Sequence, residues 1–220
     1  MTGPIPAVLF DMDGTLVDSE PVWDDALREL ARELGGELSE AAREATVGTN
    51  TDVSVGVVHA DIGRPELDPL ASGERLVALA RERFASGVRW RPGARELLDA
   101  VRAAGIPAAL VTNTERELVK VAFGALVDEL FAVSVCGDDV SRPKPHPEPY
   151  LTACELLGVR PGETVAVEDS PTGAASAEAA GCRVLVVPAT VAVPPGPDRT
   201  LARSLADVTL ADLAALPRRS

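Results

Sequence analysis

The chain has 220 residues, 46% of them hydrophobic and 25% charged, a balance typical of a globular protein that buries a sizeable core. Acidic residues outnumber basic ones by 34 to 21, and the formal net charge of -13 argues against extensive binding to nucleic acid or to an anionic membrane. No apolar run is long enough for a transmembrane helix, and no signal-peptide core precedes the first predicted strand, so we expect a cytoplasmic protein.

The first predicted strand, residues 7–10, runs directly into Asp11 and Asp13, which are followed by Gly14. Alternate residues of an extended chain point the same way, so the two carboxylates can converge on one site. Carboxylates that lie so close repel each other and require a divalent cation or a shared proton, and Mg²⁺ suits oxygen ligands on a short turn. The pattern therefore indicates phosphoryl transfer, although an Asp-Gly pair is also a common solvated turn.

Residues 18–90 show mainly helical patterns. Apolar residues recur at helical spacing from Pro21 to Leu34, residues 67–84 form a second such pattern, and the segment from Val55 to Ile62 is ambiguous. Strands and helices do not alternate here, and a block of about seventy residues is longer than an ordinary connection. We therefore expect this block to be an inserted α-helical cap.

After residue 93, short predicted strands alternate with helices, which is the rhythm of a parallel, doubly wound α/β sheet. The first strand belongs to this sheet, so the predicted core comprises residues 1–17 and 91–220, and the two crossings into the cap form its hinge. Further strands are predicted at 107–111, 132–136, 164–167 and 183–187, with a last edge strand at 208–210, and helices are predicted at 94–104, 115–123, 147–157 and 171–180.

Residues that suit phosphate binding follow the second core strand. Thr112 and Asn113 come directly after it, where a hydroxyl and nearby amides can meet a phosphate oxygen. Thr114 and Glu117 have the spacing of a helix capping box. The alternative is that this segment only ends a strand and caps a helix.

Charged residues follow at two later positions. Lys144 lies between two prolines that limit its conformations, and a restrained ammonium group can neutralise both a carboxylate and an incoming phosphate. Glu168 and Asp169 come at the end of the strand 164–167. We expect Asp169 to bind a metal ion and Glu168 to bind it directly or through water, although an acidic pair before a helix can also simply complement the helix dipole.

These side chains follow strands, and ligands of open α/β sheets bind at that edge. The string Asp11-Met12-Asp13-Gly14-Thr15-Leu16, followed in order by Thr112, Lys144 and the Glu168-Asp169 pair, resembles the four motifs of the haloacid dehalogenase-like hydrolase superfamily. The resemblance covers nearly the whole chain. It implies a Rossmann-like core with an α-helical cap inserted after the first motif.

The same resemblance implies a role for each motif residue. Asp11 would be the nucleophile that becomes an aspartyl-phosphate, and Asp13 would protonate the leaving group and later activate water. The implied Mg²⁺ ligands are Asp11, the backbone carbonyl of Asp13 and Asp169, and the implied phosphate-binding residues are Thr112 and Lys144. Glu168 as a further metal ligand and Asn113 as a further phosphate-binding residue are candidates from their positions beside these residues.

The expected function is a Mg²⁺-dependent phosphatase that hydrolyses a small phosphorylated metabolite such as a sugar phosphate. Dehalogenases of the superfamily lack an acid/base aspartate at the position of Asp13, and the phosphoglucomutase branch usually has a cap histidine at the position of Trp23. Candidate substrate contacts in the cap are Glu20, Trp23 and the turn Gly48-Thr49-Asn50, although such a turn is also an ordinary connection between helices.

Two alternative functions stay open. A phosphosugar mutase would convert one isomer into another without net release of phosphate. A receiver-like signalling module also uses a strand-end aspartate, acidic metal ligands and a lysine on a doubly wound sheet, but Asp13 and the large insertion argue against it. We expect a monomer or a homodimer, with neither nucleic acid nor a membrane as its partner.

Overall fold

The computed structural model describes residues 5–196 and 198–217. Its main sheet contains six strands in the order β5-β4-β1-β6-β7-β8, and every neighbouring pair is parallel. This order confirms the predicted doubly wound, Rossmann-like sheet. The strands of the main sheet are β1 (Val8–Phe10), β4 (Ala108–Val111), β5 (Val133–Val135), β6 (Val165–Glu168), β7 (Arg183–Val186) and β8 (Arg199–Leu201).

Helices cover both faces of the sheet. Along β1, Val8 and Phe10 pack into one apolar cluster, whereas Ala7 and Leu9 pack into the other. A strand that is buried on both faces has no polar positions, which explains the unbroken apolar run before Asp11. One face carries α8 (Glu148–Leu157) and α9 (Pro171–Ala180), and the other carries α5 (Ala94–Ala103), α6 (Arg116–Phe123), α7 (Leu126–Leu130) and α10 (Leu210–Ala215).

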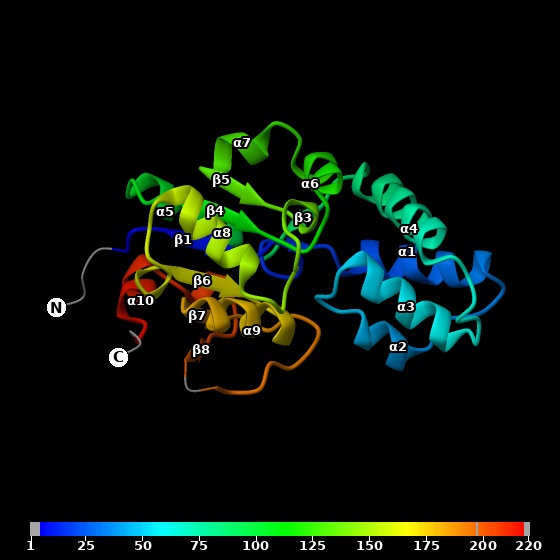
Figure 1. Cartoon of the computed structure of the whole chain (residues 1–220). Coiled ribbons are helices and arrows are strands. Elements are labelled where there is room, and N and C mark those ends of the chain that lie inside the picture. The colour runs from blue at the N-terminus through cyan, green and yellow to red at the C-terminus, as the bar shows by residue number, and fades with distance from the viewer. Residues whose placement is uncertain (1–4, 197, 218–220) are drawn as a thin grey trace.

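The chain leaves the sheet after β1 and forms four helices before it returns. These helices are α1 (Glu20–Glu33), α2 (Glu40–Ala45), α3 (Thr51–Asp61) and α4 (Pro69–Phe84), and the ambiguous segment of the sequence belongs to α3. Figure 1 shows them gathered beside the sheet, at the side away from both chain termini. The strands β2 (Val17–Asp18) and β3 (Arg89–Trp90) pair antiparallel where the insertion begins and ends.

Apolar packing joins this insertion to the sheet. Met12, Leu16 and Val17 are fully buried, and they belong to the same apolar cluster as Leu27 of α1 and Phe84 of α4. The helices of the insertion therefore rest on the loop that follows β1, which brings them close to Asp11 and Asp13. Within residues 5–196 and 198–217, no helix has both the length and the apolar composition that a membrane span requires.

The predicted edge strand at residues 208–210 is wrong. The last strand is β8, and Val208 follows the 3-10 turn η3 (Leu205–Asp207). Thr209 is the N-cap of α10, since its hydroxyl accepts a hydrogen bond from Asp212 N and its backbone N donates to Asp212 Oδ2. This capping box marks the N-terminus of a helix, and the sequence pattern resembled a strand because Val208 and Leu210 beside Thr209 are apolar.

Gly93, directly before α5, offers a test of the close packing between this end of α5 and the 3-10 turn η3. Its φ is +80°, and a Cβ there would lie 2.0 Å from the backbone nitrogen of Ala206. Gly87 has a φ of +89° but nothing within 4 Å, so it isolates the conformational cost alone. We expect Gly93→Ala to lower the free energy of unfolding by about 3 kcal/mol and Gly87→Ala by about 1 kcal/mol in urea denaturation. Equal losses would contradict the close packing at Gly93.

Candidate active site

A cavity of about 60 Å³ lies between the carboxyl ends of the strands and the helical insertion. It is far smaller than the several hundred Å³ typical of ligand pockets, so the insertion is closed over the strand ends. Glu168 is fully buried and does not line the cavity. The predicted site residues that line it are Asp11, Asp13, Glu20, Trp23, Gly48, Thr49, Asn50, Thr112, Asn113, Lys144 and Asp169.

Three carboxylates meet at the ends of β1 and β6. Phe10 pairs with Val167, and oxygen atoms of Asp11, Glu168 and Asp169 lie within 4.8 Å of one another. The parallel register therefore brings together acidic residues that are far apart in the sequence.

A glycine permits this close approach. Gly14 has a φ of +74°, and a Cβ there would lie 2.1 Å from Asp169 Oδ2. The glycine after the two aspartates therefore does more than turn the chain, because it leaves room for the third carboxylate.

Lys144 lies at the centre of these carboxylates. Its Nζ donates hydrogen bonds to Asp11 Oδ1 at 2.8 Å, Glu168 Oε1 at 2.6 Å and the Val111 carbonyl oxygen at 2.8 Å. These three contacts use every proton of the ammonium group. Tyr150, the one tyrosine of the chain, donates its hydroxyl to Glu168 Oε1, a contact that no local feature of the sequence could have predicted.

Asn113 holds the loop that carries Lys144. Its Oδ1 accepts a hydrogen bond from Lys144 N at 2.9 Å, and its Nδ2 donates to the carbonyl oxygens of Lys144 and Gly48, each at 3.2 Å. The Asn113 side chain thus links the core to the turn between α2 and α3. Its predicted contact with phosphate stays a prediction.

The carboxylate of Asp13 accepts hydrogen bonds from both sides of the cavity. Trp23 Nε1 donates to Oδ1 at 3.0 Å, and the hydroxyls of Thr114 and Thr112 donate to Oδ2 at 2.6 and 3.3 Å. The predicted capping box at Thr114 is wrong, because its hydroxyl is bonded to Asp13 and the N-cap of α6 is Glu115. Sequence reasoning therefore missed Thr114 as a site residue, since its spacing to Glu117 pointed to a local role.

Burial and neighbouring charges shift the pKa values of the ionisable side chains in the site. Burial first, then Glu168 and Asp13, raise the pKa of Asp11 from 3.8 to about 7, although Lys144 opposes the shift. Burial, followed by Asp11 and Glu168, raises the pKa of Asp169 well above its usual value. Burial lowers the pKa of Lys144, but the two facing carboxylates outweigh it and raise that pKa overall.

The donor set fits a divalent cation. Asp11 Oδ2 is buried and accepts no hydrogen bond within the part of the chain that the structure describes. The three carboxylates that meet here face a single ammonium group, which leaves excess negative charge. Hard oxygen ligands suit Mg²⁺, and a bound cation would give the buried carboxylate oxygen of Asp11 the partner that it lacks.

The cap-side turn is held by its own hydrogen bonds. Asn50 Oδ1 accepts from Val53 N at 2.9 Å as the N-cap of α3, and Thr49 Oγ1 donates to the Thr46 carbonyl oxygen at 2.9 Å. Sequence reasoning missed Arg43, which lines the cavity from α2 and carries no local signal of such a role.

The raised pKa of Asp11 predicts a pH dependence of stability in the metal-free protein. The folded chain holds this proton more tightly than the unfolded chain, so the contribution of Asp11 is full below its ordinary pKa of 3.8 and is lost as the pH rises to about 7. Between about pH 4 and pH 7.5, we expect wild type with EDTA to lose about 3 kcal/mol more unfolding free energy than Asp11→Asn. If the unfolding free energies of the two proteins, measured by urea denaturation, change equally with pH, this prediction is wrong.

Comparison with known proteins identifies the family of the chain. The family model of haloacid dehalogenase-like hydrolases matches residues 5–181. Hexitol phosphatase A of Escherichia coli K12 is 38% identical over 190 residues, which cover 84% of each chain. The phosphoglycolate phosphatase of Nitrosospira multiformis is 35% identical over 190 residues, again 84% of each chain.

A solved structure extends the match to three dimensions. The crystal structure of CbbY from Rhodobacter sphaeroides in complex with phosphate is 31% identical and superimposes with a TM-score of 0.83, over 96% of this chain and 99% of CbbY. The family model covers the helical insertion and the strands β1, β4, β5 and β6, and it ends before β7 and β8. The chain therefore belongs to the haloacid dehalogenase-like hydrolase family.

Proposed function

We propose that this protein is a Mg²⁺-dependent phosphatase that hydrolyses a small phosphorylated metabolite, such as a sugar phosphate, through an aspartyl-phosphate on Asp11. The observation that carries the proposal is the pair Asp11 and Asp13, which line one cavity beside Lys144. Two relatives are named for the hydrolysis of phosphorylated metabolites, a hexitol phosphatase and a phosphoglycolate phosphatase.

Asp11 is the proposed nucleophile. One carboxylate oxygen attacks phosphorus, the bond between phosphorus and the ester oxygen breaks, and the phosphoryl group is held on Asp11. Lys144 keeps Asp11 in place through Nζ and supplies positive charge against the phosphate. Asp11, Glu168 and Asp169, with the backbone carbonyl of Asp13, would hold Mg²⁺, which would offset the repulsion between the carboxylates and the phosphate.

Asp13 is the proposed acid and base. It gives a proton to the departing ester oxygen, then accepts a proton from the water that attacks the phosphoryl group, which regenerates Asp11 and releases phosphate. An indole N–H can only donate, so the bond from Trp23 fixes Oδ1 of Asp13 as an acceptor. The bonds from Thr114 and Thr112 hold Oδ2 and so set the direction of the carboxyl group.

The helical insertion, residues 18–90, is the proposed cap. Polar contacts between it and the core include the bond from Asn113 to Gly48 and the bond from Thr51 Oγ1 to Glu115 Oε1 at 3.1 Å, in addition to the apolar packing of α1 and α4 on the loop after β1. Because the closed cavity is small, we propose that the cap opens to admit substrate and closes to exclude water.

A phosphatase assay tests the proposal. With Mg²⁺ present, we expect wild type to release phosphate from members of a panel of phosphorylated metabolites. Asp11→Asn and Asp13→Asn should each lower kcat by at least about 10³-fold, because one removes the nucleophile and the other the proton transfer. EDTA should abolish turnover, and added Mg²⁺ should restore it.

Other results would favour the alternatives. Conversion of a phosphosugar isomer without phosphate release would favour a mutase. A long-lived phosphoprotein as the main product would favour a signalling module, which the family match across the insertion already disfavours. If wild type does none of these with Mg²⁺, the proposed function is wrong.

The contact between Trp23 and Asp13 predicts a second kinetic effect. Trp23→Phe removes the donor to Oδ1 but keeps the aromatic packing, and we expect kcat to fall about tenfold, with a change in the pH profile. Trp90→Phe is the matched control, because Trp90 packs on Phe123 away from the cavity and should keep kcat within about twofold. Equal kcat values for the two variants would contradict the role of Trp23.

A further inference from the structure

The insertion presents few charged groups to the cavity. Among the described residues that line it from this side, Glu20 of α1 and Arg43 of α2 are the charged ones. Arg43 is buried, with 8% of the residue exposed, and the Glu20 side chain is 24% exposed. Whatever group leaves the phosphate must meet this pair, because the strand ends hold the opposite side of the cavity.

Carboxylates already bind the guanidinium of Arg43. Nη2 pairs with the Glu20 carboxylate and also lies 3.4 Å from the Glu20 carbonyl oxygen. Nε donates to Asp24 Oδ1 at 3.1 Å, and Nη1 lies 3.4 Å from the Thr46 hydroxyl. A substrate anion could bind Arg43 only by displacing one of these partners.

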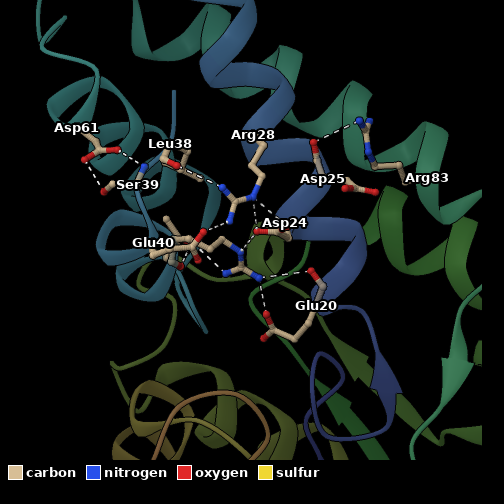
Figure 2. Close-up of polar contacts among 11 residues, drawn as sticks. Glu20, Asp24, Asp25, Arg28, Leu38, Ser39, Glu40, Asp61 and Arg83 are labelled. Atoms are coloured by element: carbon tan, nitrogen blue, oxygen red, sulfur yellow. Dashed lines mark hydrogen bonds and ion pairs between the residues drawn. The ribbon is translucent and has the colours of Figure 1, made fainter. Parts of the chain in front are cut away.

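The ion pairs continue behind Arg43, away from the cavity. Arg28 Nε donates to both oxygens of Asp24 at 3.0 Å, and Arg28 Nη2 donates to Glu40 Oε1 at 2.7 Å. Figure 2 shows Glu20, Asp24, Arg28 and Glu40 gathered between α1 and the start of α2. Two guanidinium groups thus face three carboxylates, so the cluster has a net charge of minus one.

Glu20 keeps capacity to bind a ligand. Arg43 engages Oε2, while Oε1 accepts no hydrogen bond from any residue that the structure describes. Two hydroxyls, Thr49 Oγ1 and Ser54 Oγ, line the same side and lie 2.8 Å apart. A carboxylate oxygen and two hydroxyls are suitable partners for the hydroxyl groups of a polyol or sugar.

A leaving group that carries a second negative charge would bind poorly on this side of the cavity. A second phosphate or a carboxylate must lose water on entry, and no cation in the described lining is without a carboxylate partner, since Lys144 is also bonded to Asp11 and Glu168. If such a group displaced Glu20 from Arg43, it would leave the Glu20 carboxylate without a counter-ion beside another negative charge.

We infer that Glu20, held in place by Arg43, selects a neutral, hydroxyl-rich leaving group and rejects one that carries a second anion. The inference rests on the proposed phosphatase function and narrows its substrate class to monophosphates of polyols or sugars. Arg43 then positions the selecting carboxylate and leaves recognition of the ligand to Glu20.

Kinetics with three substrates test this selection. We compare kcat/KM for a hexitol monophosphate, a hexose bisphosphate and 2-phosphoglycolate, with p-nitrophenyl phosphate as a probe of general phosphatase activity. Wild type should prefer the hexitol monophosphate by at least about tenfold over both anionic substrates. Glu20→Gln should reduce that preference by about tenfold, measured as the ratio of kcat/KM for the hexitol monophosphate to kcat/KM for each anionic substrate.

Glu40→Gln is the matched control. It removes the same charge from the same cluster, but Glu40 is exposed, pairs with Arg28 and does not line the cavity. This variant should keep the wild-type preference within about twofold. A preference that falls equally in both variants would show that net charge, and not the Glu20 contact, selects the substrate, and it would overturn the inference.

Binding to Asp11→Asn separates this inference from the proposed function. Isothermal titration calorimetry gives Kd for the same three ligands without turnover. If wild type releases no phosphate but Asp11→Asn still binds the hexitol monophosphate most tightly, the phosphatase proposal fails and the selection stands. If wild type hydrolyses the bisphosphate or 2-phosphoglycolate as well as the hexitol monophosphate, the phosphatase proposal stands and the selection is wrong.

Discussion

The buried ammonium group of Lys144 is the interaction on which the site depends. It joins the end of β1, through Asp11, to the end of β6, through Glu168, and it also binds the carbonyl oxygen at the end of β4. Without this charge, buried carboxylates would lie close together with little to offset their repulsion. One ammonium group does not balance the charge of these carboxylates. The remaining negative charge favours binding of a cation and suits a divalent metal ion.

Asp13 connects this charge cluster to the helical insertion. Its carboxylate is held by Trp23 from α1 and by Thr114 before α6, so the two donors come from opposite sides of the cavity. The direction of the proposed acid and base therefore depends on how the insertion is seated. A movement that separates α1 from the strand ends would remove the hydrogen bond from Trp23 to Asp13, which would couple the proposed opening of the cap to the proposed proton transfer.

Two predictions from local sequence patterns were wrong because the residues concerned have other partners in the folded chain. Thr114 and Glu117 have the spacing of a capping box, but the Thr114 hydroxyl is bonded to Asp13, which is distant in sequence. Residues 208–210 look like a strand because of their β-branched and apolar composition, yet Thr209 caps a helix. In the first case a tertiary contact replaced a local one, and in the second a local contact replaced an expected sheet pairing.

The sheet, the helical insertion and the polar residues at the strand ends could be predicted from the sequence. Strands buried on both faces require unbroken apolar runs, and parallel strands place the residues that follow them at one edge, so Asp11, Lys144 and Asp169 could be brought together from their order alone. The hydrogen-bond partners of Asp13 and the pairing of Glu20 with Arg43 could not be predicted from the sequence and are visible in the folded chain alone. These contacts join helices and loops whose relative orientation depends on side-chain packing, and no local period of the sequence encodes that orientation.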